Sequence, residues 1–256
     1  IAIILVITIL VFSGVLKNGF TNWDDNLYVL DLEIIRSFSW ENIKAMFSQL
    51  VASLYTPLTI LSFAVDYSFF KLDPTGYHAV NLFLHLVSIV LVFKLFTYWT
   101  ENPWIRFAAT LLFAIHPLNA EPVAWISGRK DLLFSLFYLA GLISYYKYRN
   151  QKMLKWILLT ALFFILSIFS KPTALTFPFV LLLIDFFEND YKIKKGEVLQ
   201  KVPLILISLA FFVFGLLLVK EVNVFEKAPE GYSLFDKISL AAYALAFYIY
   251  STPVPF

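Results

Sequence analysis

The sequence predicts an all-α polytopic membrane protein, a bundle of about eight transmembrane helices with a large first external loop that contains interfacial helices. Two observations predict this class. Hydrophobic residues make up 60% of the chain and charged residues only 15%, whereas soluble domains average about 45–50% and about 25%. The apolar residues also gather in runs long enough to cross a bilayer. The chain has no cysteine, which excludes disulfides and thiolate-bound metals.

Each predicted transmembrane helix occupies an apolar run of suitable length. A helix needs about 20 mostly apolar residues to cross the hydrocarbon core, or a few fewer where its ends reach the interface. The runs that fit are residues 1–16, 77–99, 104–116, 132–148, 154–170, 172–187, 202–220 and 238–250. No internal repeat or low-complexity linker divides them. We therefore expect one membrane domain, residues 1–256, cut from a longer protein at both ends.

Basic residues near the helix ends predict the orientation. Residues 147–155 and 192–201 are two short segments rich in lysine and arginine, and the positive-inside rule places such segments in the cytoplasm. The opposite, external face then carries residues 17–76, 116–131, 170–172 and 221–236. The unusual polar residues of the chain all fall on this face.

The first external segment is about 60 residues long, which is uncommon for a connection without a role of its own. Within it, SWENIKAMFS reads as a short helix with Ser39 as its N-cap. The run TPLTILSFAVDYSFF is apolar but too brief to span a bilayer. We expect both to be helices that lie in or near the membrane interface.

This segment opens with NWDDN, in which Asp24 and Asp25 directly follow Trp23. Tryptophan suits the headgroup region, so the two carboxylates are expected close to the bilayer surface. Charge is costly there, and a pair of adjacent carboxylates therefore indicates a functional site. The alternative is that Asp24 caps a helix or is only solvated.

The second external segment, HPLNAEPVAWISGRKD, packs charges of both signs between two apolar runs. His116 and Glu121 on this turn are candidate ligands for a divalent metal, Mg or Mn, together with a carboxylate from another loop. The spacing of these ligands is not regular. Since His116 precedes Pro117, it alternatively serves only to end a helix.

Two cations on the external face are candidates for binding a phosphate. Basic residues are disfavoured on this face, so Arg129 with its neighbour Lys130, and Lys171, indicate an anionic partner. The planar guanidinium of an arginine can donate two hydrogen bonds to a phosphate at once. The alternatives for Arg129 are an ion pair with Asp131 and anchoring to lipid headgroups.

Three polar residues share one helix face at the external end of the second predicted span, namely His78, Asn81 and His85. They are suited to line a groove for a lipid phosphate. The alternative is that they make interhelical hydrogen bonds, which we favour for His85, the deepest of them.

The order of four segments carries a resemblance to a known family. These segments are NWDDN, YTPLTILSFAVDYSFFKLDPTGYHAVNLFLHL, FAIHPLNAEPVAWISGRKDLLFSLFYL and FSKPTALTFPFVLLLIDFF. Over residues 22–187 the chain resembles the membrane half of the bacterial tetratricopeptide-repeat (TPR) membrane proteins. These are similar to the transmembrane and TPR-containing O-mannosyltransferases of the GT-C glycosyltransferase superfamily.

The resemblance implies a GT-C-like bundle in the bacterial inner membrane with an extracytoplasmic active site. It implies a polyprenyl-phosphate sugar as donor, a protein or glycan as acceptor, and no nucleic-acid partner. A TPR domain, where present, would follow residue 256. In the family the acidic pair after the first span is catalytic, which maps onto Asp24 and Asp25, and the acidic position of the second loop maps onto Glu121.

The chemistry of these residues agrees with the resemblance. A carboxylate is needed to take a proton from the acceptor hydroxyl, and cations are needed to hold the phosphate as it leaves. Arg129 and Lys171, with His78 nearby, would hold that phosphate. A transporter would place charges near the bilayer midplane instead. A noncatalytic GT-C-like scaffold, anchoring a TPR domain or a larger assembly, does not require the four charged positions Asp24, Glu121, Arg129 and Lys171 to converge.

Overall fold

The computed structural model describes residues 1–192, 194–221 and 233–251. Most of the external segment predicted at residues 221–236 therefore lies outside the described residues. Within the described ranges every named element is a helix, as predicted. The α-helices are α1 (Ala2–Phe12), α2 (Trp40–Met46), α3 (Pro57–Phe70), α4 (Pro74–Trp99), α5 (Pro103–Ile115), α6 (Ala120–Ala124), α7 (Arg129–Gln151), α8 (Leu154–Ser170), α9 (Phe177–Glu188), α10 (Lys195–Glu221) and α11 (Leu234–Ser251). Short 3-10 or π turns are η1 (Ser13–Lys17), η2 (Asn26–Leu30), η3 (Glu33–Arg36), η4 (Pro117–Asn119), η5 (Ile126–Gly128) and η6 (Pro172–Thr176).

Each predicted span coincides with a helix, but the predicted number of spans is not confirmed. Among the described residues, two helices are long and apolar enough to cross a membrane, Pro74–Trp99 and Lys195–Leu218. Four other apolar helices are shorter, and α7 carries charged residues at both of its ends. The figure of about eight was wrong because it counted every apolar run, including those whose helices are too short or too polar to meet the same test.

The helix ends follow from local sequence. Asp73 caps α4 by accepting a hydrogen bond from the Thr75 amide at 3.0 Å, and Pro74 occupies the first helical position. Ser39 caps α2, as predicted, by accepting one from the Asn42 amide at 3.2 Å. At the end of α7 the backbone of Lys152 turns into the left-handed region, with φ of 54°, and α8 begins two residues later.

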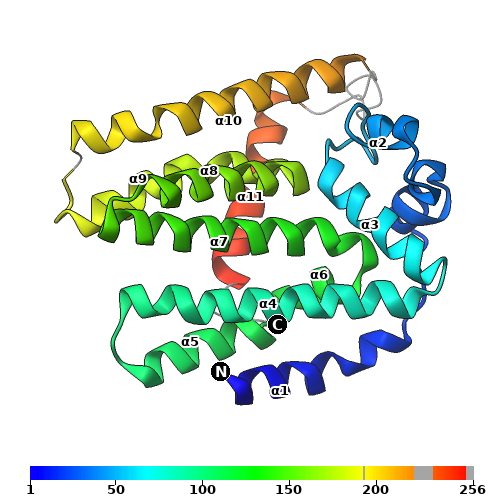
Figure 1. The fold of residues 1–256 in the computed structure, drawn as a ribbon, viewed down its shortest axis with the longest axis horizontal. Helices are drawn as coiled ribbons and strands as arrows, with labels where there is room; N and C mark the ends of the chain where they lie inside the picture. The colour runs from blue at the N-terminus through cyan, green and yellow to red at the C-terminus, as the bar shows by residue number, and fades with distance from the viewer. Residues whose placement is uncertain (193, 222–232, 252–256) are drawn as a thin grey trace.

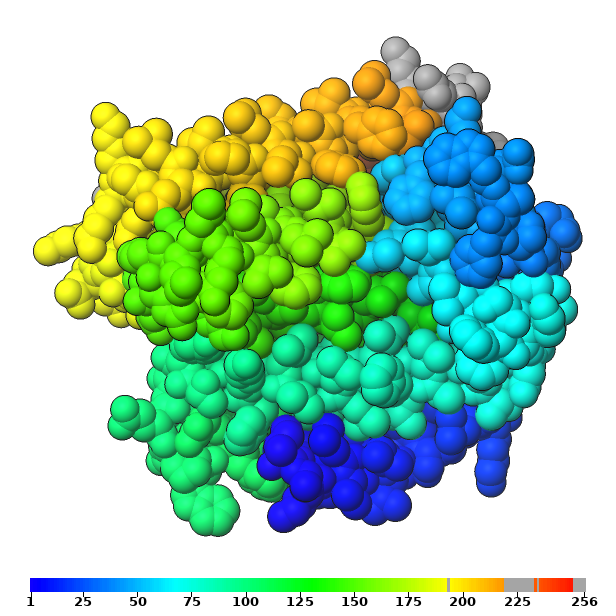
Figure 2. Space-filling model, in the orientation of Figure 1, coloured from blue at the N-terminus to red at the C-terminus, as the bar shows by residue number. Residues whose placement is uncertain are grey.

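The long helices lie side by side, with α10 along one side, α7, α8 and α9 in the middle, and α4, α5 and α1 on the other side (Figure 1). We call the end that carries residues 17–73, 116–131 and 170–176 the loop end, and the end that carries residues 147–155 and 189–201 the lysine end. Helices α2 and α3 lie over the loop end, where α3 contacts α4 and α8. They form the blue to cyan region on the right of Figure 2. The first external segment therefore covers one end of the bundle.

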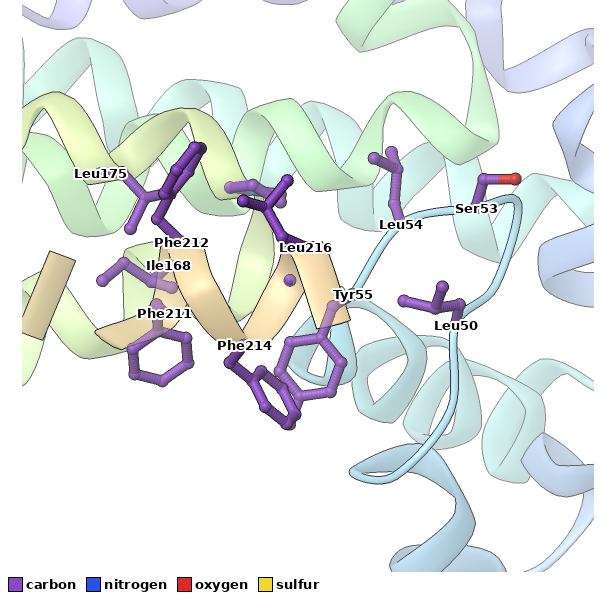
Figure 3. A pocket seen from close by; sticks show the side chains of 12 residues that line it. Leu50, Ser53, Leu54, Tyr55, Ile168, Leu175, Phe211, Phe212, Phe214 and Leu216 are labelled. Carbon is purple, nitrogen blue, oxygen red and sulfur yellow. The ribbon is translucent and has the colours of Figure 1, made fainter. Parts of the chain in front are cut away.

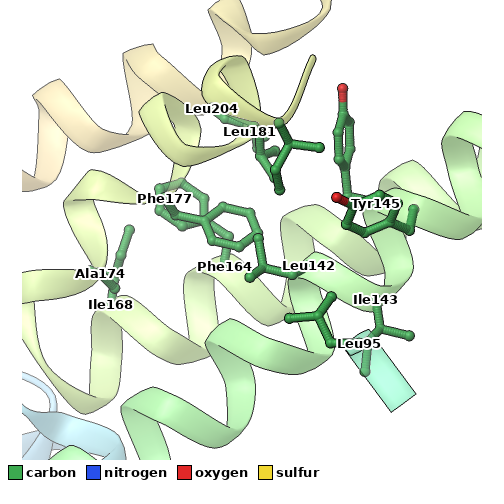
Figure 4. Close-up of a cluster of buried hydrophobic side chains, with 12 residues drawn as sticks. Leu95, Leu142, Ile143, Tyr145, Phe164, Ile168, Ala174, Phe177, Leu181 and Leu204 are labelled. Carbon is green, nitrogen blue, oxygen red and sulfur yellow. The ribbon is translucent and has the colours of Figure 1, made fainter. Parts of the chain in front are cut away.

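The largest core cluster lies between α7, α8, α9 and α10. Phe164 and Phe177 stack with ring centroids 5.3 Å apart, surrounded by leucines and isoleucines (Figure 4). Gly141 on α7 permits this packing, since a Cβ there would lie 2.8 Å from the Phe177 ring. Such a contact is closer than van der Waals packing allows.

Polar side chains make the specific links between these helices. His85 on α4 bonds the Ala114 carbonyl of α5 at 2.9 Å, which confirms the interhelical role predicted for it. Ser167 on α8 donates to the Phe134 carbonyl of α7 at 3.0 Å. In an apolar environment such bonds fix the register of neighbouring helices.

At the lysine end, a buried ionic cluster joins α7, α9 and α10. Asp185 of α9 forms an ion pair with Lys201 and a second one with Arg149 at 3.3 Å, and it accepts a hydrogen bond from Tyr145 at 2.6 Å. Lys201 was predicted to lie in a basic cytoplasmic loop. That prediction was wrong, because this lysine is 1% exposed inside α10, where Asp185 neutralises it.

Candidate active site

The loop end brings Asp24 and Lys130 together across 106 positions of the chain. The Lys130 ammonium lies 2.8 Å from a carboxylate oxygen of Asp24. The Asp24 side chain is 29% exposed, whereas that of Lys130 is only 8% exposed. The Asp24 carboxylate is therefore accessible from outside the protein, whereas the Lys130 ammonium that pairs with it is nearly buried.

Asp25 has a different environment from its neighbour. It is fully buried, and its two oxygens accept four hydrogen bonds from just two residues. Oδ2 accepts from the amide and hydroxyl of Thr21, both at 2.9 Å. Oδ1 accepts from the amide of Ser127 at 2.9 Å and from its hydroxyl at 2.5 Å. This carboxylate is saturated with donors, so its role is to fasten the first loop to η5.

Lys130 was not among the predicted site residues. It sits in the first turn of α7, where the helix dipole disfavours a cation, so helix stability does not explain its position. Besides Asp24, its ammonium lies 4.5 Å from the ring centre of Trp125 and 5.2 Å from that of Tyr28. Both rings attract a cation through their faces. The sequence signal for Lys130 was its position in the charged segment RKD, but the phosphate was assigned to the neighbouring Arg129 instead.

A second ion pair lies beside the first. Lys171, at the end of α8, pairs with Asp131, which follows Lys130 in α7. Both side chains are part-exposed, at 27% and 31%. Of the two cations predicted to bind phosphate, Lys171 is thus the one that the structure leaves accessible.

Tyr28 of η2 lies within electrostatic reach of the carboxylates of both pairs. Burial raises the pKa of its hydroxyl to about 12, opposed by a hydrogen bond with Thr56, and the carboxylates of Asp24 and Asp131 raise it further. The hydroxyl therefore stays protonated at neutral pH. It lies 3.3 Å from the Val51 carbonyl, to which it donates, and 3.5 Å from the Thr56 hydroxyl.

Arg129 does not lie in an open site. It is fully buried, its guanidinium donates to Asp66 at 2.7 Å and to the Tyr77 carbonyl at 3.0 Å, and it also bonds Asn81. It also stacks over the Phe63 ring, 5.1 Å from its centre. The prediction that Arg129 meets a phosphate is thus corrected in favour of an interior ion pair that binds α3 and α4 to the start of α7. The expected alternative partner was Asp131, which instead pairs with Lys171.

The remaining predicted residues do not join this group. His78 is buried in α4 beside the Gly19 backbone, within electrostatic reach of Asp25. His116 lies at the end of α5, as the alternative expected, and its ring nitrogen also caps η4 by accepting a hydrogen bond from the Leu118 amide at 3.2 Å. Glu121 is exposed on α6.

Across the described part of the chain, no three His, Asp or Glu side chains come together in a way that could hold a metal ion. The protein therefore offers no dedicated cage of three such ligands there, whereas Mg²⁺ is often held by one or two carboxylates together with waters and a substrate phosphate. The predicted metal site at His116 and Glu121 stays a prediction.

An apolar cavity of about 220 Å³ opens at the loop end. It lies between the loop that precedes α3, the start of η6 and the last turns of α10 (Figure 3). Tyr55 and Phe214 meet edge to face at 5.1 Å on one side of it, and Pro172 lines it as well. Pro172 follows Lys171 in the chain, so the backbone of the accessible cation reaches this apolar cavity while its ammonium pairs with Asp131.

Gly128 gives a test of how this site is held together. A Cβ at this position would lie 2.7 Å from the Pro122 carbonyl oxygen, which is backbone and cannot turn aside. Gly128→Ala should therefore push η5 away from α6 and lower the free energy of unfolding by about 1–3 kcal/mol, measured from denaturation in detergent. Gly14→Ala is the matched control, because a Cβ there meets nothing within 4 Å. Equal stability of the two variants would contradict the packing described here.

Comparison with known proteins supports a specific relationship. No protein-family model matches the chain, and no solved structure matches it either. Several curated proteins do. They are protein O-mannosyl-transferases. The chain is 40% identical to TMTC3 of Homo sapiens over 91 residues, which cover 36% of the chain and 10% of that protein.

Two further relatives match longer stretches. A protein O-mannosyl-transferase of Caenorhabditis elegans is 36% identical over 139 residues, 52% of the chain and 19% of that protein. TMTC1 of Mus musculus is 34% identical over 160 residues, 57% of the chain and 17% of that protein. The chain spans between a tenth and a fifth of the length of these relatives. The predicted likeness to O-mannosyltransferases is confirmed to this extent, and its bacterial side stays a prediction.

Proposed function

We propose that this chain is the membrane part of a glycosyltransferase that moves a sugar from a polyprenyl-phosphate donor to a hydroxyl of a protein or glycan acceptor. The observation that carries the proposal is the part-exposed Asp24 carboxylate held on Lys130, whose chain neighbour Asp131 holds the part-exposed Lys171. An apolar cavity lined by Pro172 lies one residue further along the chain. The names of the relatives support it and make mannose the first sugar to test. The proposal places the bundle in a membrane, with the loop end on the extracytoplasmic face of a bacterial inner membrane.

In the proposed reaction Asp24 is the general base. The acceptor hydroxyl approaches Asp24, its oxygen forms a bond to the anomeric carbon, and its proton passes to the carboxylate. The bond between that carbon and the phosphate oxygen of the donor breaks, and polyprenyl phosphate leaves with the electron pair on that oxygen. Lys130 and Lys171 stabilise the charge that develops on the leaving phosphate. Asp25 acts as a positioning residue, because it fixes the loop that carries Asp24.

The cavity lined by Pro172, the chain neighbour of Lys171, takes the part of the polyprenyl tail nearest to the phosphate. Its volume of about 220 Å³ is below the roughly 300–1,000 Å³ of sites that enclose a whole small ligand. The rest of a long tail would therefore lie along the bundle. No step is assigned to Mg or Mn, and their part in the reaction stays a prediction to be checked by adding EDTA to the assay.

A noncatalytic scaffold is the second candidate, and one observation favours it. It does not require the four charged positions to converge, and Arg129 and Glu121 indeed lie apart from the Asp24 pair, one buried in an ion pair and one exposed on α6. Asp24 and Lys171 remain on one face with their partners Lys130 and Asp131.

Transfer by the purified protein in lipid decides between these functions. The assay supplies polyprenyl-phosphate mannose and other labelled polyprenyl-phosphate sugars, with secreted proteins as acceptors. Transfer from at least one donor supports the enzyme. No transfer from any donor, in protein whose circular dichroism shows it folded, would favour the scaffold.

The cavity yields a prediction about donor length. Gly215 lines it, and a Cβ at this position meets nothing within 4 Å, so Gly215→Leu should fill the space without straining α10. Excluding two methylene groups of tail, at about 0.8 kcal/mol each, should raise the KM for a long-chain donor roughly tenfold. Gly196→Leu, on the same helix but away from the cavity, is the control. An unchanged KM in Gly215→Leu would contradict the proposal that the donor tail occupies this cavity.

A further inference from the structure

Three lysines from three helices meet at the lysine end. The ammonium of Lys147 on α7 lies 4.1 Å from the ring centre of Trp156, and that of Lys155 on α8 lies 5.0 Å from the same ring. Lys94 on α4 is close enough to repel Lys147 electrostatically. A single indole therefore holds two cations, and a third cation adds to their positive potential.

Nothing that the structure describes neutralises this group. In the described ranges, none of the ion pairs involves any of the three lysines. Of the acids at this end, Asp185 pairs with Lys201 and Arg149, Glu188 pairs with Arg149, and Glu197 accepts a hydrogen bond from Asn189. The mutual repulsion of like charges without a counter-charge raises the free energy of the folded protein, so the arrangement favours binding of an anion from outside the chain.

The surface next to these lysines is apolar. Leu154, Leu158 and Leu162 follow one another at helical spacing along α8, and their exposed fractions are 69%, 59% and 48%. The stripe begins one residue before Lys155, and Trp156, whose ring suits the boundary between water and hydrocarbon, lies at the same level. A free phosphate has no apolar part that could cover this stripe, whereas a phospholipid does.

We propose that Lys94, Lys147 and Lys155 bind the phosphodiester of an anionic phospholipid at the lysine end, with one acyl chain along the stripe of Leu154, Leu158 and Leu162. This site lies at the opposite end of the bundle from Asp24. It goes beyond the proposed transferase and rests only on its membrane placement. Basic pockets between helices at a membrane surface recognise anionic headgroups by this combination of charge and apolar track.

The test uses brominated lipids, whose bromine atoms quench the fluorescence of a nearby tryptophan. The protein is reconstituted into vesicles with brominated phosphatidylglycerol or brominated phosphatidylcholine. The difference between each protein and its Trp156→Phe counterpart isolates the signal of Trp156. We expect phosphatidylglycerol to quench Trp156 at a lower mole fraction than phosphatidylcholine. In Lys147→Gln/Lys155→Gln this preference should fall by roughly an order of magnitude.

Lys192→Gln/Lys194→Gln is the matched control, because it removes the same charge from exposed lysines of the same end. It should keep the preference. Equal quenching by the two lipids in the unaltered protein, or an equal loss in both double variants, would overturn the site. Loss of the preference on adding inorganic phosphate would reveal a site for the free anion and overturn the lipid. Absence of quenching by either lipid would overturn the site and the membrane placement, whereas sugar transfer is measured separately.

Discussion

Asp24→Asn is expected to reduce sugar transfer by roughly 10²–10⁴-fold, because an amide cannot take the proton of the acceptor hydroxyl. The change keeps the shape of the side chain, and its amide oxygen can still accept from Lys130. Because Lys130 is only 8% exposed and loses its counter-charge, the free energy of unfolding should fall too, so the rate is compared per folded protein. The measurement is the initial rate of transfer at saturating donor, with the unfolding midpoint recorded on the same preparation.

Two comparisons make this result specific. Asp31→Asn removes an exposed carboxylate from the same loop and should leave transfer unchanged. Asp25→Asn should reduce stability, since an amide nitrogen would face some of the four donors that now meet the carboxylate. Full activity in Asp24→Asn would show that another group accepts the proton.

Asp66→Asn is expected to lower the free energy of unfolding by about 3–5 kcal/mol. The substitution leaves the guanidinium of Arg129 buried without its counter-charge, 0% exposed and unable to reach water. The loss should be visible as a lower unfolding midpoint in detergent. An Asp66→Asn protein as stable as the unaltered one would contradict the view that this pair is closed to solvent.

The double variant Asp66→Leu/Arg129→Met separates structure from catalysis. Replacing both charges by apolar groups removes the uncompensated charge, so part of the lost stability should return. The return is partial because the Tyr77 carbonyl and Asn81 also lose their donor. Transfer by the folded fraction should continue. If the folded double variant does not transfer sugar, this would support the original prediction that Arg129 binds the donor phosphate.

The sequence predicted the helices well because apolar runs and capping residues are local signals. Ser39 caps α2 as expected, and each apolar run became a helix. The number of spans was overestimated since several of these helices, such as α5 with 13 residues, are shorter than a bilayer crossing requires. Whether a short helix crosses, tilts or packs on the surface depends on its neighbours, which a single run does not reveal.

The site was predicted only in outline for a geometric reason. Successive residues of a helix point about 100° apart, so the neighbours Arg129 and Lys130 face different surroundings, and the sequence alone does not say which one faces inward. The structure places Arg129 in the core and Lys130 beside Asp24. The same applies to Asp24 and Asp25, whose different roles depend on Ser127, far away in the chain.

Long-range partners also explain the other differences. Lys201 resembled a residue of a basic loop because its partner Asp185 lies 16 positions earlier. His116 and Glu121 are near in sequence, and the residues between them form η4, which brings no third His, Asp or Glu to them in the described part of the chain. From the sequence, Lys147 and Lys155 were used only as part of a basic segment that predicts orientation, and their approach to Trp156 was not predicted.

The bond between Asp25 and Ser127 has a consequence for biogenesis. The two residues are separated by 102 positions, and α4 and α5 are made between them. During synthesis the first loop must therefore wait, with its carboxylate in water, until the ribosome has delivered η5. The Asp24 site cannot form on the nascent chain before that point, which makes the loop end a late-maturing part of the molecule and one exposed to quality-control proteases until it closes.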